Sequence, residues 1–241
     1  MSGHSKWNNI KHKKEKADAA KAKIFTKIGK EMAVAIKEGG PDPNNNSRLR
    51  DLISKAKANN VPNENIQRTI KKFTESNDIN YEEITYEGYG PSGVAIIVET
   101  STDNRNRTAG NVRAAFNKYG GNLGQNGCVG FLFEEKGVIT IVDEDDELDE
   151  DKVMEDALEC GAEDIKCDDG EYTIYTSVDD FAEVREAVIA LGYTLATADL
   201  AKVPSTYVDL DNEEDIENME KMLDKFNEDD DVNAVYHNWN A

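Results

Sequence analysis

The sequence is poor in the residues and segments that mark several familiar protein classes. Only three of its 241 residues are cysteines, Cys128, Cys160 and Cys167, and this odd, unpaired set indicates no disulfide framework. No run of about 18 apolar residues occurs, so no membrane-spanning helix is expected. Residues 1–16 lack the apolar core of a secretory signal. We therefore expect a cytoplasmic protein that does not bind membranes.

The spacings typical of catalytic and metal sites are also missing. The chain contains no HExxH, no pair of CxxC motifs and no nucleophile elbow, and its three histidines are scattered. Glycines at every third position from Gly121 to Gly130 match neither a P-loop nor a GxGxxG motif, and they predict a loop. The acidic run 143–151 lacks the glycine of an EF-hand loop. We expect no cofactor, no metal and no enzyme activity, although an enzyme site in a cleft between domains stays open as a third hypothesis.

Charge is divided unevenly along the chain. The whole sequence has 28 Lys and Arg against 49 Asp and Glu, a formal net charge of −21. Residues 1–76 nevertheless hold 17 basic and 8 acidic residues, whereas the remainder holds 11 basic and 41 acidic residues. This asymmetry predicts a basic module that binds a polyanion. The acidic remainder suggests a surface for another partner, such as a protein.

The N-terminal part predicts a small helical domain, residues 1–77, with a disordered basic tail. From Asp18 onward, apolar residues recur every fourth position through Ile24, Ile28, Met32 and Ile36, which indicates one helix ending at the glycines 39–40. Two further helices are expected, one over residues 47–59 and one that begins after Pro62.

The rest of the chain predicts two α/β domains, one inserted in the other. Expected strands at 83–89, 94–100 and 129–133 and a helix at 103–119 leave a middle domain incomplete. Residues 135–204 then follow the βαββαβ order of the ferredoxin-like fold. A strand at 206–210, a helix at 213–226 and a strand at 232–237 would complete the middle domain, which is therefore discontinuous, 78–134 and 205–241. The expected fold class is multidomain α+β.

The candidate binding residues begin with lysines. Lys23, Lys27, Lys30 and Lys37 fall on one side of the expected helix beside its apolar stripe, and we call these four residues the lysine face. The preceding tail adds the candidates Lys6, Trp7, Lys11, Lys13, Lys14 and Lys16. Lysines that neutralise phosphates release counterions, so this pattern favours a nucleic-acid backbone as ligand. An ordinary solvated helix face is the competing interpretation, and Trp7 could stack on a base or anchor the tail.

Two arginines in the acidic half are further candidates. Arg105 and Arg107, with Arg113 nearby, lie at the start of an expected helix, where free N–H groups favour anions. They could equally pair with neighbouring carboxylates. Residues 1–76 contain 14 Lys and only 3 Arg, a bias that favours recognition of backbone and shape over dense reading of base edges.

Several segments together resemble the YebC family over the length of the chain. They are residues 1–7 (MSGHSKW), Ile10-Lys11, residues 40–43 (GPDP), residues 60–62 (NVP), residues 86–91 (YEGYGP) and residues 102–108 (TDNRNRT). The resemblance implies a helical N-terminal domain and two α/β domains, and a cytoplasmic regulator of gene expression. It implies DNA-binding transcriptional regulation as one function. It also implies an alternative, a factor that binds ribosomal RNA on the ribosome and assists translation through proline-rich stretches.

Overall fold

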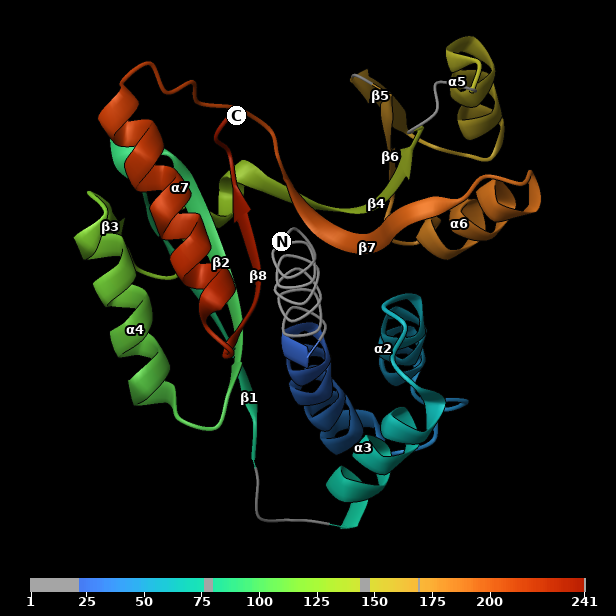
Figure 1. Ribbon diagram of the computed structural model, residues 1–241, viewed down its shortest axis with the longest axis horizontal. Helices are drawn as coiled ribbons and strands as arrows, with labels where there is room; N and C mark the ends of the chain where they lie inside the picture. The colour runs from blue at the N-terminus through green and yellow to red at the C-terminus, as the bar shows by residue number, and fades with distance from the viewer. Residues whose placement is uncertain (1–21, 76–79, 144–147, 169, 241) are drawn as a thin grey trace, which may run out of the picture. The chain divides into compact units, whose positions relative to one another are not determined.

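The structure, a computed structural model, describes residues 22–75, 80–143, 148–168 and 170–240 (Figure 1). The chain divides into two compact units. One comprises Met1–Val129 together with Val208–Ala241, and the other comprises Gly130–Tyr207.

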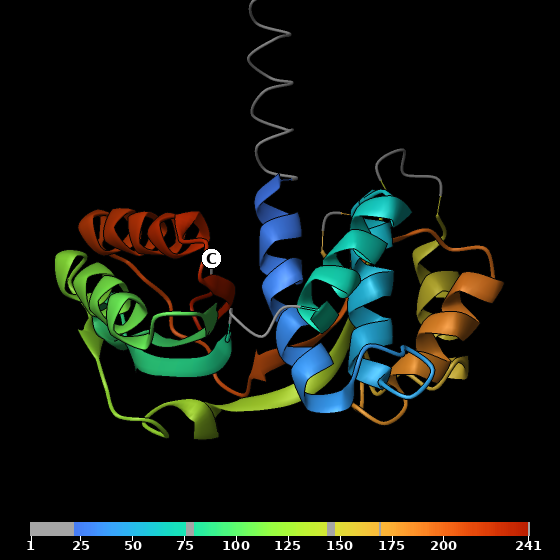
Figure 2. The ribbon, with the colours of Figure 1, turned by 90° about the horizontal axis from the view of Figure 1, so that it is seen from below.

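Three helices form the N-terminal part of the first unit. Residues 22–39 are helical and are called the first helix here, followed by α2 (Ser47–Ala58) and α3 (Asn63–Glu75), which Figure 2 shows from a second direction. The stripe residues Ile28, Met32 and Ile36 are buried against Leu49 and Ile66. The fourth described residue of the stripe, Ile24, is exposed. The helical domain therefore forms around the side of the first helix that the apolar spacing indicated.

Asn46 fastens the first helix to α2. Its side-chain oxygen accepts a hydrogen bond from Leu49 N, which caps α2, and its amide donates to Ala35 O and Gly40 O. Gly40 ends the first helix with φ +84°, a conformation that favours glycine. One buried amide thus satisfies backbone groups at two helix ends.

A four-stranded antiparallel sheet carries the rest of the first unit. Its order is β3-β1-β2-β8, with β1 at Glu82–Tyr89, β2 at Ala95–Thr102, β3 at Asn122–Leu123 and β8 at Val232–His237. The helices α4 (Arg105–Lys118) and α7 (Glu213–Glu228) pack on one face of it (Figure 1). Phe116 and Phe226 meet in that core with ring centroids 5.3 Å apart. Because β8 pairs with β2, the C-terminal segment completes a sheet that begins before residue 90.

The second unit has the ferredoxin-like order. Its sheet is β5-β6-β4-β7, and all of its strand pairs are antiparallel. Ile139, Ile174, Val184 and Val188 are buried between the sheet and its helices. The element bounds are β4 Phe133–Val142, α5 Glu150–Glu159, β5 Asp164–Asp168, β6 Glu171–Thr176, α6 Phe181–Ala190 and β7 Leu195–Pro204. With the three helices and the first sheet, this confirms the predicted α+β class.

Two strands expected from the sequence are wrong. Residues 129–133 were expected to form a strand, but Gly130–Leu132 is a short 3-10 helix. The Glu87 carboxylate accepts from Gly127 N and Val129 N, so a side chain and not a sheet partner satisfies that backbone.

The segment 206–210 was also expected to be a strand. It contributes only one bridge, Val208 to Trp239. Val208 itself exchanges hydrogen bonds with Asn238 and Asn240, and this pairing is not continued along the segment.

Candidate nucleic-acid interface

The candidates of the basic tail lie outside the described residues. These are Lys6, Trp7, Lys11, Lys13, Lys14 and Lys16. Their contact with nucleic acid stays a prediction.

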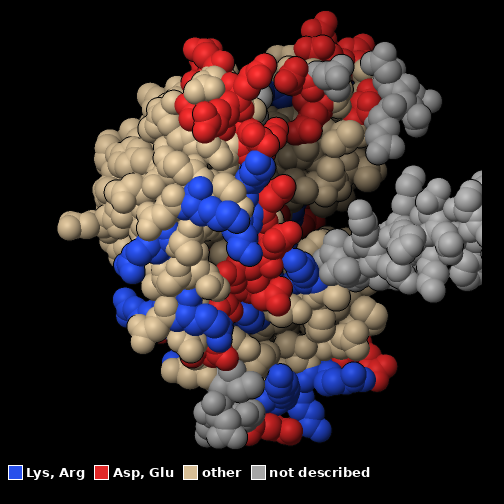
Figure 3. Space-filling model, turned by 60° about the vertical axis from the view of Figure 1, so that its left-hand side comes forward, with Lys and Arg blue, Asp and Glu red and all other residues tan. Residues whose placement is uncertain are grey.

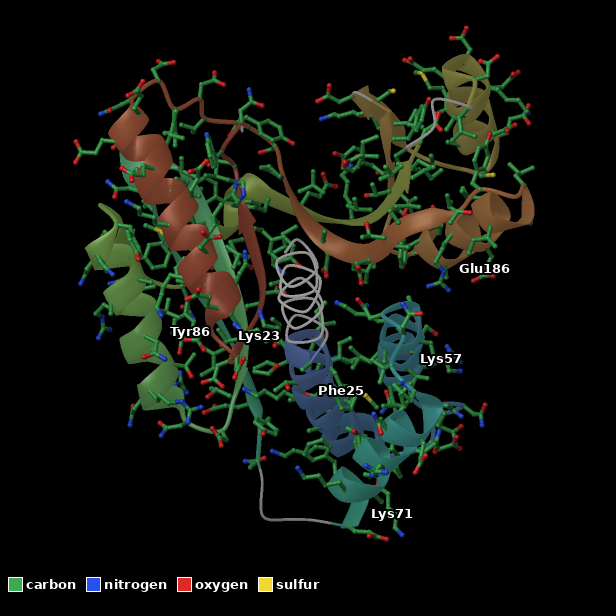
Figure 4. The ribbon with its side chains drawn as sticks, viewed as in Figure 1. Lys23, Phe25, Lys57, Lys71, Tyr86 and Glu186 are labelled. Carbon is green, nitrogen blue, oxygen red and sulfur yellow. The ribbon has the colours of Figure 1, made fainter. Side chains whose placement is uncertain are left out.

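Three members of the lysine face lie together and meet the C-terminal end of α7. All three ammonium groups donate to main-chain carbonyl oxygens there, and Figure 4 shows Lys23 between the first helix and the end of α7. The contacts are Lys23 Nζ to Glu228 O at 3.2 Å, Lys27 Nζ to Asn227 O at 3.1 Å and Lys30 Nζ to Asp230 O at 2.8 Å. We call residues 227–231 the α7 terminus. The lysine spacing seen in the sequence therefore produces one surface, and the chain's own oxygens occupy it.

The α7 terminus attracts cations for a general physical reason. The last carbonyls of a helix have no intrahelical donor, and the helix dipole places partial negative charge there. Burial lowers the pKa of Lys27, and the neighbouring charge of Lys23 lowers it further, while Asp230 and Asp229 act in the opposite direction. The lysines are crowded against one another, and the acidic end of α7 compensates for their repulsion.

Asp231 is the centre of this contact. Its side chain is 5% exposed, and Lys30 Nζ lies 2.6 Å from Oδ1. On the other side, Arg107 Nη2 and Thr108 Oγ1 donate to Oδ2 at 2.7 and 2.8 Å, and Thr102 Oγ1 donates at 3.2 Å. Burial alone would raise the pKa of Asp231, but the hydrogen bonds from Lys30, Arg107 and Thr108 outweigh it and lower the pKa to about 2. Asp231 is therefore charged at neutral pH.

The two candidate arginines have different surroundings. Arg107 binds Asp231 and also Asp103, at 2.8 Å, and these hydrogen bonds raise its pKa. The Arg105 side chain is 70% exposed, and its Nη1 lies 4.0 Å from Glu82 Oε2. Of the two interpretations of these arginines, pairing with carboxylates describes Arg107. The Arg105 side chain is accessible to a ligand.

The remaining member of the lysine face, Lys37, donates to Asn80 Oδ1. All four lysines that the sequence placed on one helix face therefore contact oxygens of this chain. Sequence reasoning missed the acceptor Asp231, because it stands in the run Glu228-Asp229-Asp230-Asp231, where nothing in the sequence separates the buried carboxylate from its solvated neighbours.

Other basic side chains of the helical domain face solvent. Arg50, Lys57, Lys71 and Lys72 are exposed on α2 and α3, and Figure 4 shows Lys57 and Lys71 on different helices, well separated. Arg48 pairs with Glu38 and Glu83. The solvent-facing positive charge is therefore spread over two helices.

The helix α4 has no acidic residue, which is unusual in this chain. It exposes Arg105, Arg113 and Lys118 along its length. Figure 3 shows, however, that lysine and arginine side chains on that side of the molecule are interleaved with aspartate and glutamate. The surface there is mixed in charge and is not one continuous basic area.

The described residues offer little that resembles a reaction centre. A pocket of ≈ 190 Å³ lies between α4 and α7, lined by Asn111, Lys118, Lys225, Asp229 and neighbouring residues. No group of three His, Cys, Asp or Glu residues within the described ranges is arranged to hold a metal ion. Among the same residues, no helix combines the length and the apolar character needed to span a bilayer.

Comparison with known proteins identifies relatives of this chain. Residues 5–76 match the model of the TACO1/YebC protein N-terminal domain, and residues 81–239 match that of the TACO1/YebC second and third domain. The chain belongs to the TACO1/YebC family. It is 56% identical to a "Probable transcriptional regulatory protein" of Agathobacter rectalis and 54% identical to one of Lachnoclostridium phytofermentans, over 99% of each chain in both cases. The crystal structure of a conserved hypothetical protein from Aquifex aeolicus is similar, with a TM-score of 0.84 and 42% identity over 92% of this chain and 91% of that one.

The TACO1/YebC matches also locate the lysine contacts within the family's architecture. The N-terminal match ends at residue 76 and the second begins at residue 81, between α3 and β1. Lys23, Lys27 and Lys30 belong to the first match, and the α7 terminus belongs to the second. In this TACO1/YebC chain, the lysine face therefore joins the N-terminal domain to the part that follows it.

Proposed function

We propose that the protein is a nucleic-acid-binding regulator of gene expression that acts in the cytoplasm and whose basic segment, residues 1–76, contacts the nucleic acid. The observation that carries this proposal is the segregation of charge: 17 basic and 8 acidic residues in this segment, followed by 11 basic and 41 acidic residues. The names of the relatives, "Probable transcriptional regulatory protein", support it. The proposed activity is binding and involves no catalytic step.

The kind of recognition follows from the arginines. Residues 1–76 contain three arginines, and two of them form ion pairs. Arg48 pairs with Glu38 and Glu83, and Arg68 pairs with Glu64. Arg50 is exposed. Since bidentate arginine contacts with guanine are the commonest specific base contacts, this segment has few means to read base edges. Its lysines are suited to phosphates, so it recognises the nucleic acid by backbone and shape.

Two targets are compatible with backbone recognition. A DNA-binding transcriptional regulator is the function that the relatives' names suggest, and its specificity would come from DNA shape or from a dimer. A factor that binds ribosomal RNA is the second candidate, and the shortage of free arginines favours it because structured RNA is recognised chiefly by shape and backbone. In both cases the acidic remainder repels phosphates, orients the basic segment toward the nucleic acid and presents a surface for a protein partner.

A competition titration with the full-length protein tests the proposal. The protein is titrated with a labelled DNA duplex against scrambled duplex and against structured ribosomal RNA at several salt concentrations. A variant with Lys13→Gln, Lys14→Gln and Lys16→Gln is expected to bind more weakly, with a log–log salt slope smaller by roughly 2.7, since each phosphate contact contributes about 0.9.

The matched control removes three lysines outside the basic segment, with Lys166→Gln, Lys221→Gln and Lys225→Gln. Equal losses in both variants would contradict the assignment of binding to residues 1–76. Preference for one duplex over its scrambled form by about 4–10 kcal/mol would support the DNA regulator. Equal binding of all duplexes, together with sedimentation on ribosomes, would support the RNA candidate.

A further inference from the structure

We propose that nucleic acid and the α7 terminus compete for three residues of the lysine face, Lys23, Lys27 and Lys30, so that nucleic-acid binding releases the N-terminal domain from α7. This inference rests on the proposed function, because it concerns how the proposed contact surface is regulated. It assigns two alternative ligands, one intramolecular and one external, to Lys23, Lys27 and Lys30.

The geometry sets the two ligands in competition, most strictly at Lys30. The three ammonium groups already have oxygen atoms of the α7 terminus within 3.2 Å. Lys30 is the most enclosed, because it donates to both Asp230 O and Asp231 Oδ1 and its side chain is 11% exposed. Because Lys30 is enclosed in this way, a phosphate reaches its ammonium group only if the α7 terminus withdraws. Phosphate contact with Lys23, Lys27 and Lys30 together therefore requires the α7 terminus to leave.

The α7 terminus resembles a short stretch of nucleic-acid backbone in the features that lysine recognises. It presents carbonyl oxygens without intrahelical donors at the negative end of a helix, and Asp229, Asp230 and Asp231 add three carboxylates. A duplex carries about one negative charge per 1.7 Å of its axis and also gains free energy from counterion release. An external duplex therefore outcompetes the internal ligand at low salt, and the internal ligand regains the lysines as salt rises.

Release leaves Asp231 with its other hydrogen-bond donors. When a buried carboxylate loses its only cationic partner, the folded state is strongly destabilised. Arg107, Thr108 and Thr102 belong to the same side of the contact as Asp231, and they continue to donate to its Oδ2 after Lys30 departs. The contact between Lys30 and Asp231 can therefore open without leaving an unpaired buried charge. Asp231 keeps its other donors, and Lys30 gains a phosphate.

A distance measurement on the full-length protein tests the release directly. Spin labels are placed on Lys57→Cys of α2 and Glu220→Cys of α7, both exposed positions, after Cys128, Cys160 and Cys167 are replaced by Ser. Double electron–electron resonance is recorded without nucleic acid, with a short DNA duplex and with an RNA duplex of the same sequence, all at low salt. We expect the distance distribution to shift and broaden when a duplex is bound. An unchanged distribution with bound duplex would overturn the inference.

An affinity measurement tests the competition independently. The variant Asp229→Asn with Asp230→Asn removes two charges that attract Lys27 and keeps one side-chain oxygen at each position. At residue 229 that oxygen can replace one of the two acceptors that Asp229 offers to Asp231 N and Asn111 Nδ2. The variant is expected to bind a duplex about two- to thirty-fold more tightly, since it removes two charge interactions worth about 0.2–1 kcal/mol each.

The matched control, Asp179→Asn with Glu183→Gln, removes two exposed carboxylates from the second unit and reports the general effect of lowering negative charge. We expect a smaller gain in affinity for this control. An equal gain in both variants would overturn the competition.

The two experiments also separate this inference from the proposed function. If neither duplex binds the wild-type protein or any variant, both are overturned. If a duplex binds while the label distances stay fixed, the proposed function stands and the competition fails. Comparison of the DNA and RNA arms shows which backbone displaces the α7 terminus.

Discussion

Lys30 and Asp231 form an ion pair that is shielded from solvent, with 2.6 Å between Nζ and Oδ1. The two residues are 201 positions apart in the sequence, and they join the first helix to the segment between α7 and β8. Arg107 approaches the same carboxylate from α4. One side chain therefore connects three elements of the first unit.

Replacement of Asp231 by alanine is expected to lower the free energy of unfolding by about 3–5 kcal/mol, because it leaves Lys30 and Arg107 without their shared partner. Denaturant unfolding followed by circular dichroism measures this. Asp230→Ala is the control, since Asp230 is exposed and such substitutions change stability by no more than about 0.5 kcal/mol. Equal effects of the two substitutions would show that the ion pair contributes little.

The low pKa of Asp231 predicts a loss of stability in acid. Its pKa is lowered to about 2 in the folded chain, below its unfolded value of about 3.9, so its contribution is complete above pH 5. As the pH falls from about 4 to 2, the unfolded state takes up the proton first, and about 2 kcal/mol is lost. Unfolding curves measured from pH 7 to pH 2 check this, and the decline should be smaller in Asp231→Asn. An identical decline in that variant would assign the acid sensitivity to other carboxylates.

Two glycines provide a matched test of packing. A Cβ at Gly88 would lie 2.6 Å from Asn122 O and 2.9 Å from the Phe116 ring, so Gly88→Ala should destabilise the first sheet by about 1–3 kcal/mol. A Cβ at Gly110, in the middle of α4, would meet nothing within 4 Å. Gly110→Ala should therefore stabilise the protein by about 0.5–1 kcal/mol. Thermal unfolding of both variants measures the difference, and destabilisation by Gly110→Ala would contradict the open surroundings of that position.

Glu87 should hold the glycine-rich loop in place. Its two carboxylate oxygens accept from Gly127 N at 2.9 Å and Val129 N at 2.8 Å, so Glu87→Gln exchanges one acceptor for a donor facing an N–H. We expect a loss of about 1–3 kcal/mol in stability and faster proteolysis within residues 124–129. Glu82→Gln, at an exposed position on the same strand, is the control. Unchanged cleavage rates in Glu87→Gln would show that the loop is held by other contacts.

Local patterns determined much of the fold. The spacing of Ile28, Met32 and Ile36 indicated the buried side of the first helix, and the strand over residues 232–237 has the predicted bounds. The βαββαβ order of the second unit was also readable, because alternation and helical periodicity repeat within a few residues. The strands expected at 129–133 and 206–210 were wrong because their backbone partners, the Glu87 carboxylate and Asn238, are supplied by distant parts of the chain.

The sequence by itself also determined that Lys23, Lys27 and Lys30 share one helix face, since this follows from 3.6 residues per turn. Only the tertiary structure decided what that face contacts. Lys27 and its acceptor Asn227 are 200 residues apart, and the acceptor is a main-chain carbonyl that any residue type would supply. Asp231 is buried, whereas its acidic neighbours are not. This difference likewise follows from the tertiary structure, because α4, β2 and the first helix converge on Asp231. A charge pattern is local, but the choice between a phosphate and the end of α7 depends on which oxygens the folded chain brings within reach.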